Sequence, residues 1–114
     1  KAQNSDICLK DIKNLTKINI QIEKSIETLV KSCDTIITTT PSTEYLVKAD
    51  WVNEGTHILA IGSDQSEKNE IDPNIFKKVN CFIPDRLSQS KKLGEALGLQ
   101  GPQLDSGIEI FTAL

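Results

Sequence analysis

Two short runs of β-branched residues, separated by a polar connection, constrain the fold of this chain most. The first run lies within Asp34 to Ser42, and the second extends from Thr56 to Ile61. Their composition is typical of strands, and a Pro-Ser pair after the first run and a Gly-Ser pair after the second turn the chain. In open α/β sheets, ligands bind just beyond the carboxyl ends of the strands. Candidate functional residues are therefore Thr40 and Asp64, which stand at two such ends.

The rest of the chain alternates between strand and helix patterns. Strands are expected at residues 17–22, 35–40, 56–61, 80–83 and 108–111, and helices at 26–33, 74–79 and 86–97. Ser25 supplies an N-cap for the first helix, and Asp72-Pro73 supply the cap and first residue of the second. The alternation predicts right-handed βαβ units and a parallel sheet with central strands buried on both faces. The expected fold class is α/β, a mostly parallel sheet flanked by helices.

The size and charge of the chain limit its function. Its 114 residues fit one domain, and a net charge of -3 argues against a nucleic-acid or anionic-membrane surface. No apolar run is long enough to span a bilayer. The three cysteines, Cys8, Cys33 and Cys81, show no metal-binding spacing. We expect reduced, mostly buried thiols in a cytoplasmic protein and no metal site.

The two ends of the chain indicate a fragment of a longer protein. It begins at Lys1, contains no methionine, and stops directly after the strand pattern at 108–111. We expect residues 1–114 to form a single, partial domain of a longer protein.

Three side chains are the main candidates for chemistry. Asp64 follows the small pair Gly62-Ser63, which lets a cofactor approach closely, although a turn or capping aspartate fits the same position. Lys68 suits a phosphate or carboxylate, or is a solvated surface charge. The hydroxyl or backbone of Thr40 suits a ribose or pyrophosphate, although a plain strand residue is equally consistent with the pattern.

Other features favour structural roles. His57, the only histidine, lies early in its strand and far from the ligand-facing end, so we interpret it as structural. Trp51 is interpreted as a packing residue. The stretch from Gln65 to Glu70 is expected to be charged and exposed. No GxGxxG, Walker, HExxH or GxSxG motif occurs, so the chain has no complete catalytic signature.

The order and spacing of the motifs resemble the ornithine cyclodeaminase/mu-crystallin family. The segment Cys33-Asp-Thr-Ile-Ile-Thr-Thr-Thr-Pro-Ser42 is similar to that family's Thr-x-Thr-Pro-Ser strand end. The segment Asp50-Trp-Val-Asn-Glu-Gly-Thr-His-Ile-Leu-Ala-Ile-Gly-Ser-Asp64 resembles its Gly-Thr-His-Ile and Gly-x-Asp motifs. Ser25-Ile-Glu-Thr-Leu-Val30 and Gly107-Ile-Glu-Ile-Phe111 resemble the flanking elements, so the likeness covers about residues 16–114.

This resemblance implies an incomplete Rossmann-type domain that binds NAD or NADP. The family's first βα unit, with its glycine-rich phosphate turn, is expected upstream of Lys1. Members act on small amino-acid or imine substrates as cyclodeaminases, alanine dehydrogenases or ketimine reductases, and the parent protein is expected to be a homodimer. The chain alone is expected to bind NAD weakly and to be inactive.

The resemblance also assigns roles to single residues. The family's catalytic aspartate falls on Asp64, which would exchange protons with the substrate amine or the attacking water. Thr40, Lys68 and the backbone of Ile61, Gly62 and Ser63 would contact the cofactor. The alternatives are a non-catalytic, mu-crystallin-like ligand carrier and another Rossmann dehydrogenase, such as a shikimate dehydrogenase-like or glutamyl-tRNA reductase-like protein.

Overall fold

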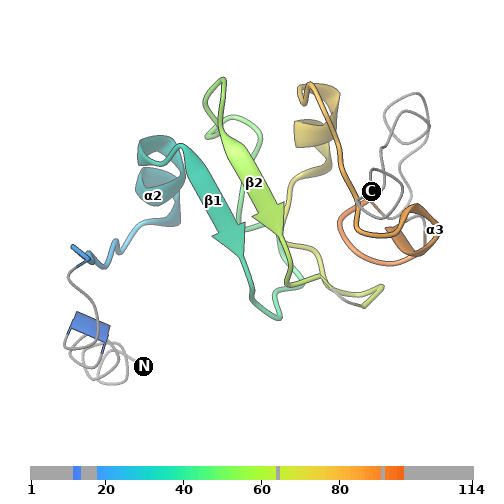
Figure 1. Ribbon diagram of the computed structural model, residues 1–114, viewed down its shortest axis with the longest axis horizontal. Helices are drawn as coiled ribbons and strands as arrows, with labels where there is room; N and C mark the ends of the chain where they lie inside the picture. The colour runs from blue at the N-terminus through green and yellow to red at the C-terminus, as the bar shows by residue number, and fades with distance from the viewer. Residues whose placement is uncertain (1–11, 14–17, 64, 91, 97–114) are drawn as a thin grey trace.

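A parallel pair of strands lies at the centre of the structure (Figure 1). The computed structural model describes residues 12–13, 18–63, 65–90 and 92–96. Strand β1 (Thr35–Thr38) pairs with strand β2 (His57–Ala60), and their register places Thr35 opposite His57 and Thr38 opposite Ala60. Both strands were expected, and both end before the residues proposed for function. The parallel pairing was also expected and is confirmed.

Among the described residues, only one face of this sheet is covered. Ile36 and Ile58 point into the core and are partly buried. On the opposite face Ile37 is 62% exposed and Leu59 is 45% exposed, and Ile61, just beyond β2, is 64% exposed. The expectation of burial on both faces is therefore wrong for these strands. Side chains alternate between the faces of a strand, and the helices and turns that the structure describes pack on one face.

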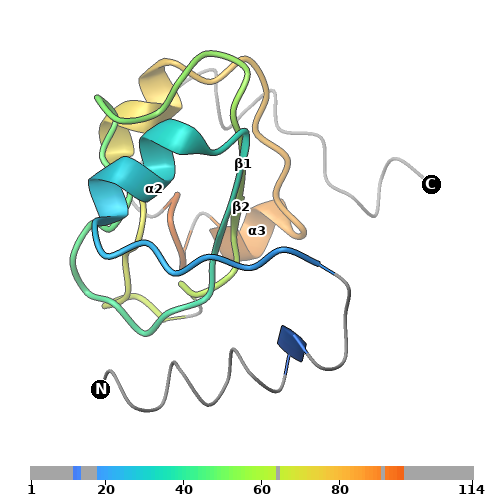
Figure 2. The ribbon, with the colours of Figure 1, turned by 90° about the vertical axis from the view of Figure 1, so that its left-hand side faces the viewer.

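Two short helices cover the buried face. Helix α2 (Ile26–Ser32) and the 3-10 helix η1 (Pro73–Lys77) lie on the same side of the sheet when it is viewed along its edge (Figure 2). Both place side chains in one hydrophobic cluster with the connection between the strands, and its buried members are Val30, Val47, Ala49, Ile71, Ile75 and Phe76. Burial of such side chains supplies most of the driving force for folding.

Helix α2 forms where its cap predicts. The Ser25 hydroxyl accepts a hydrogen bond from the Thr28 backbone N–H at 3.2 Å, as an N-cap should. Val30 faces the core and is 2% exposed, whereas Ile26 and Leu29 are 47% and 46% exposed. The predicted helix is confirmed, but much of its apolar surface faces away from the core.

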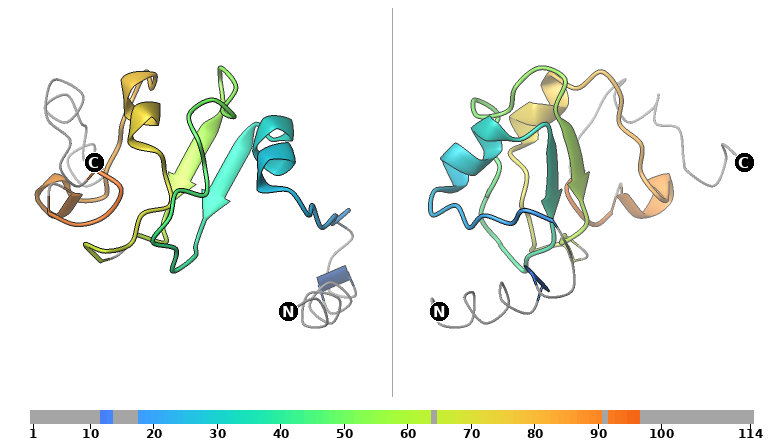
Figure 3. Two further views of the ribbon diagram at one scale, coloured as in Figure 1. Left: turned by 180° about the vertical axis from the view of Figure 1, so that it is seen from behind. Right: turned by 60° about the vertical axis from the view of Figure 1, so that its left-hand side comes forward.

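The connection from β1 to β2 docks on η1. Seen from behind, this connection returns along the sheet to the start of β2 (Figure 3). Val47, in its middle, forms an isolated parallel bridge with Ile71, just before η1. Trp51 packs partly buried against the core, and the Lys48 ammonium lies 4.9 Å from its ring centroid. The packing role predicted for Trp51 is confirmed.

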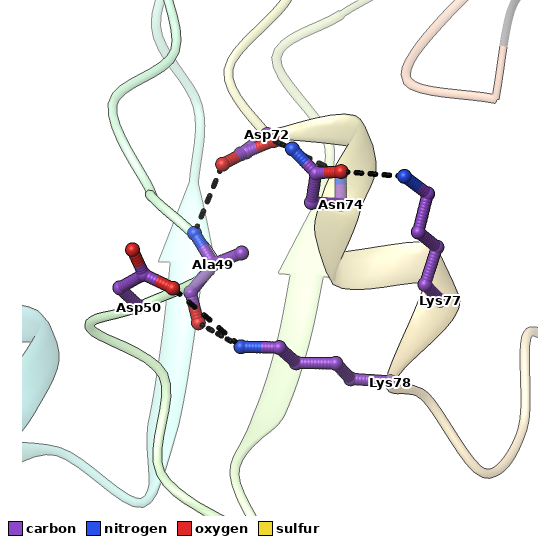
Figure 4. A network of polar contacts seen from close by, with 6 residues as sticks. All are labelled: Ala49, Asp50, Asp72, Asn74, Lys77 and Lys78. Atoms are coloured by element: carbon purple, nitrogen blue, oxygen red, sulfur yellow. Dashed lines mark hydrogen bonds and ion pairs between the residues drawn. The ribbon is translucent and has the colours of Figure 1, made fainter.

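Asp72 fixes the start of η1 and the connection at the same time (Figure 4). Its Oδ1 accepts from the Asn74 backbone N–H at 2.9 Å, and its Oδ2 accepts from the Ala49 N–H at 3.2 Å. The Lys78 ammonium donates to the Ala49 carbonyl at 3.2 Å and lies 3.7 Å from Asp50 Oδ1. The hydrogen bond from Asn74 outweighs partial burial and lowers the pKa of Asp72. The predicted cap is confirmed, although the helix it starts is 3-10 in type.

Three predicted elements differ from the structure. Residues 18–22 and 80–83 form no strand. The helix expected at 86–97 is only one turn long, α3 (Leu87–Ser90), and the described residues after it form turns and bends. Gly94 among them has a φ of 83°, which is incompatible with continuing a helix. The strand expected at 108–111 lies outside the described residues.

The cysteines also differ from expectation. Cys33 is half-buried and Cys81 is exposed, so the described thiols are not mostly buried. Cys8 lies outside the described residues. No helix in the described part of the chain is long and apolar enough to cross a membrane.

Candidate functional site

The carboxyl ends of β1 and β2 meet at one edge of the sheet, as the sequence predicts. The backbone N–H groups of Ile61 and Gly62 both donate to the Thr38 carbonyl, at 3.0 and 3.1 Å. Thr40 and Gly62 each follow their strand by two residues, so both lie at this edge. Asp64, the proposed catalytic residue, lies outside the described residues.

Glu70 joins the two strand ends. Its Oε1 accepts hydrogen bonds from the Thr40 backbone N–H and from the Thr40 hydroxyl, both at 2.6 Å. Its Oε2 accepts from the Gly62 backbone N–H at 3.1 Å. Glu70 is 0% exposed, so the expectation that residues 65–70 are all exposed is wrong at this position. One buried carboxylate therefore holds three donors from both strand ends.

These contacts restrict what Thr40 can offer a ligand. Its hydroxyl proton goes to Glu70, and its oxygen also accepts from the Ser42 backbone N–H at 3.2 Å. A threonine hydroxyl has one proton and two lone pairs, so one lone pair stays available. Thr40 Oγ1 can therefore accept a hydrogen bond from a ligand hydroxyl.

Gly62 is required by the close approach of Glu70. A Cβ at this position would overlap with the Glu70 carboxylate and lie 2.6 Å from the Thr40 backbone nitrogen. Since the Thr40 nitrogen belongs to the backbone, it has little freedom to move away. The small residue predicted to admit a cofactor is thus needed, in this structure, to admit the carboxylate.

A second buried carboxylate supports the first. Glu95 is 9% exposed and accepts from the backbone N–H groups of Glu70 at 2.7 Å and Ile71 at 2.9 Å. The side-chain amide nitrogen of Asn69, oriented toward two acceptors, also donates to Glu95 Oε2 at 2.5 Å and to the Ile71 carbonyl at 3.0 Å. Glu95 thereby holds the backbone from which the Glu70 side chain extends.

The two carboxyl groups have opposite pKa shifts. Burial acts to raise the pKa of Glu70, but the hydrogen bonds from Thr40 and Gly62 stabilise the anion and lower the pKa overall. Burial raises the pKa of Glu95, and the nearby Glu70 charge adds to this, against the two backbone N–H bonds. Glu70 is therefore an anion at neutral pH.

The other predicted residues form the turn after β2. The Ser63 hydroxyl donates to the Lys68 carbonyl, and the Lys68 N–H donates to the Gln65 carbonyl at 3.2 Å. Ser63 and Lys68 are both half-buried. The predicted residues Thr40, Ile61, Gly62, Ser63 and Lys68 therefore lie close together in the fold.

His57 lies at the other end of the sheet. It is the first residue of β2 and is exposed, and its N–H donates to the Asp34 carbonyl at 2.8 Å. This places it where the sequence predicted, away from the carboxyl ends of the strands. In the part of the chain that the structure describes, no group of three or more His, Cys, Asp or Glu side chains could hold a metal ion.

Sequence reasoning missed Glu70 and Glu95. Glu70 ends a charged stretch, and its only local signal is the Ile71-Asp72-Pro73 that follows and leads into η1. Glu95 follows a glycine in a segment expected to be helical. Neither position has a pattern that distinguishes it from a solvated charge.

Comparison with known proteins identifies related chains. The family model for the ornithine cyclodeaminase/mu-crystallin family matches residues 1–110. An alanine dehydrogenase of Archaeoglobus fulgidus is 52% identical over 63 residues, which are 55% of this chain and 19% of that protein. Ketimine reductase mu-crystallin of Rattus norvegicus is 29% identical over 96 residues, 84% of this chain and 28% of that protein.

A solved structure supports the fold. An archaeal alanine dehydrogenase dimer with bound NAD is 45% identical, has a TM-score of 0.60, and is matched over 68% of this chain and 23% of its own. This likeness and the parallel strand pair confirm an α/β fold that corresponds to part of a Rossmann-like domain. The matches cover less than a third of the length of each of these relatives.

Proposed function

Since this chain belongs to the ornithine cyclodeaminase/mu-crystallin family, we propose that it forms the nucleotide-binding part of an NAD(P)-dependent oxidoreductase. The parent enzyme would act at a carbon–nitrogen bond of a small amino acid or cyclic imine. The observation that carries this proposal is the shared edge at which β1 and β2 end, with Thr40 and Gly62 side by side. That edge is where open α/β sheets bind dinucleotides.

The residues at this edge fit a dinucleotide. The exposed apolar side chain of Ile61 offers a surface for a flat ring, and Thr40 Oγ1 offers a free lone pair to a ribose hydroxyl. The backbone of Gly62 and Ser63 and the half-buried Lys68 complete the proposed contacts. NAD(P), when bound, supplies the hydride acceptor or donor.

Asp64 is the proposed catalytic residue. It directly follows Ser63 and is separated from Gly62 by that one residue. A carboxylate at this place would take a proton from the substrate amine, or from the attacking water, as hydride moves to or from the cofactor. The proposed parent protein is a homodimer, which is supported by the archaeal alanine dehydrogenase, whose solved structure is a dimer with bound NAD.

Substitution of Asp64 tests the proposal in the full-length protein that contains this chain. With L-alanine, L-ornithine and a cyclic ketimine as probes, D64N should abolish NAD(P)-dependent turnover while NADH still binds. The matched control is D34N, because Asp34 is an exposed aspartate just before β1, at the opposite end of the sheet. Unchanged turnover in D64N would contradict the catalytic role. Absence of both NADH and NADPH binding to the unmodified protein would contradict the whole proposal.

A further inference from the structure

We propose that Glu70 is a positioning residue of this site, which sets the spacing between the end of β1 and the end of β2. Its role in cofactor binding rests on the function proposed above. Its role in holding the strand ends does not, because that role follows from the contacts alone.

The two oxygens of the Glu70 carboxylate bind the two different strand ends. One oxygen of Glu70 holds the N–H and hydroxyl of Thr40, at 2.6 Å each, and the other holds the N–H of Gly62 at 3.1 Å. Hydrogen bonds to an ionised acceptor are shorter and stronger than those between neutral groups. Any movement of one strand end relative to the other must therefore stretch or break a charge-assisted bond.

The three donors at the strand ends require an acceptor group that carries no protons. An ionised glutamate accepts at both oxygens, whereas a glutamine carries two N–H donors on one side. In E70Q, the NH₂ group would face either the N–H of Gly62 or the two donors of Thr40. The amide keeps the size of the side chain but leaves at least one strand end without its acceptor.

Glu70 is itself held in place by a second carboxylate. Glu95 binds the backbone N–H groups of Glu70 and Ile71, at 2.7 and 2.9 Å. Gly94, the residue before Glu95, lies close to the turn after β2. A Cβ at Gly94 would lie 3.0 Å from the Ser63 carbonyl oxygen. The turn at residues 92–96 therefore backs the edge where the strands end, and Glu95 links this turn to Glu70.

A residue with this role affects how the cofactor binds more than the rate of the chemical step. Glu70 is completely buried, so it acts on a ligand through Thr40 and Gly62. If the strand ends move apart, the groups proposed to contact the dinucleotide lose their common geometry. The KM for NADH should then rise, whereas kcat at saturating cofactor should stay close to that of the unmodified protein.

The test uses hydrogen exchange and kinetics on the full-length protein with E70Q and E95Q. E70Q should raise the amide exchange rates at Thr40 and Gly62 about tenfold or more. The local opening that exposes these amides costs less free energy when about one charge-assisted hydrogen bond is missing from the closed state. It should also raise the KM for NADH about tenfold, with kcat changed less than about threefold. E95Q should raise exchange at Glu70 and Ile71 first. The matched control is E67Q, because Glu67 is an exposed glutamate in the same segment between β2 and η1. E67Q should change neither exchange nor KM.

A second variant keeps the proposal testable if E70Q does not fold. T40V removes one of the three bonds to Glu70, and it should raise exchange at Gly62, although the Thr40 side chain and Gly62 share no hydrogen bond except through this carboxylate. Unchanged exchange at Gly62 in T40V, or unchanged exchange and KM in E70Q, would overturn the positioning role. If exchange rises as expected but the unmodified protein binds neither NADH nor NADPH, the proposed function fails and the role of Glu70 in joining the strands stands.

Discussion

Glu70 Oε1 lies 2.6 Å from both the backbone nitrogen and the hydroxyl oxygen of Thr40, thirty residues earlier in the chain. The same carboxylate reaches Gly62 with its other oxygen. These bonds join distant segments around a buried anion. We therefore expect the residues at this end of the sheet to lose their structure cooperatively when one of the bonds is removed.

Removal of the Thr40 hydroxyl should destabilise the fold. T40V keeps the size of the side chain but loses the bond to Glu70, which should lower the free energy of unfolding by about 1–2 kcal/mol, since Thr40 itself is partly solvated. T40S keeps the hydroxyl and should stay within about 0.5 kcal/mol of the unmodified chain. Urea denaturation measures both values, and equal losses in the two variants would exclude the hydroxyl as the cause.

Enlargement of Gly62 should destabilise the fold for lack of space. G62A places a Cβ against the Glu70 carboxylate and the Thr40 backbone, and overpacking of this kind costs about 1–3 kcal/mol. G55A is a useful comparison, because Gly55 has a φ of 83° but open space around it. Its cost should come from backbone strain alone, with no effect at Thr40. Thermal denaturation and amide exchange at Thr40 distinguish the two causes; a G62A protein as stable as the unmodified one would contradict the close approach.

Acidification should remove stability that Glu70 supplies. Its pKa is lowered in the fold from the ordinary 4.5, so the unfolded chain takes up the proton first as the pH falls. The stabilisation is complete above 4.5 and is lost as the pH decreases through the folded-state value. E70Q should therefore be less stable than the unmodified chain at neutral pH, and the difference should shrink in acid.

Glu95 should have the opposite dependence, which provides the control. Its pKa is raised in the fold, so its ionisation costs stability as the pH increases from 4.5 through the folded-state value. Urea midpoints from about pH 3 to 7 for the unmodified chain, E70Q and E95Q measure both effects. Parallel profiles for the unmodified chain and E70Q would contradict the assigned shift of Glu70.

Loss of the Asp72 carboxylate should release η1 and the connection before β2 together. D72A removes the acceptor for the Asn74 and Ala49 N–H groups, and loss of such a cap costs about 1 kcal/mol. D72N retains one acceptor oxygen and should cost less. Denaturation gives the energies, and exchange at Ala49 should rise in D72A; an unchanged rate there would show that the second contact contributes nothing.

The 114-residue chain alone should bind NADH weakly and turn over no substrate. It contains no GxGxxG phosphate turn, and the N-terminus of the helix that follows such a turn supplies much of the anion site for a dinucleotide. Isothermal titration calorimetry of this chain with NADH measures the affinity. A micromolar dissociation constant would refute the expectation.

Elements with local signals could be predicted from the sequence. Ser25 caps α2, Asp72 caps η1, and β-branched residues form β1 and β2, because each of these preferences acts between near neighbours. The strands predicted from the alternation at 17–22 and from the apolar residues at 80–83 are absent from the described residues. A strand also needs a partner strand to pair with, and neither segment has one among the described residues. The helix expected from Arg86 to residue 97 ends at Ser90, and the positive φ of Gly94 is incompatible with a helix that continues through that position.

The location of the candidate site could be predicted from the sequence, but the residues that hold it together could not. The edge at Thr40 and Gly62 follows from the parallel strands, which the pattern indicated. The carboxylate that joins them comes from Glu70, thirty residues beyond Thr40, and is supported by Glu95 a further 25 residues along. Such a long-range arrangement has no periodicity, so a buried glutamate looks like any other charge in the sequence.

The open face of the sheet affects how the protein behaves when it is handled. Ile37, Leu59 and Ile61 present adjoining apolar side chains to water, and contiguous surfaces of this kind attract one another. Samples of this chain should therefore self-associate as they are concentrated, and mild detergent or a charged substitution at Ile37 should keep them dispersed. Purification and crystallisation depend on this face as much as on the stability of the fold.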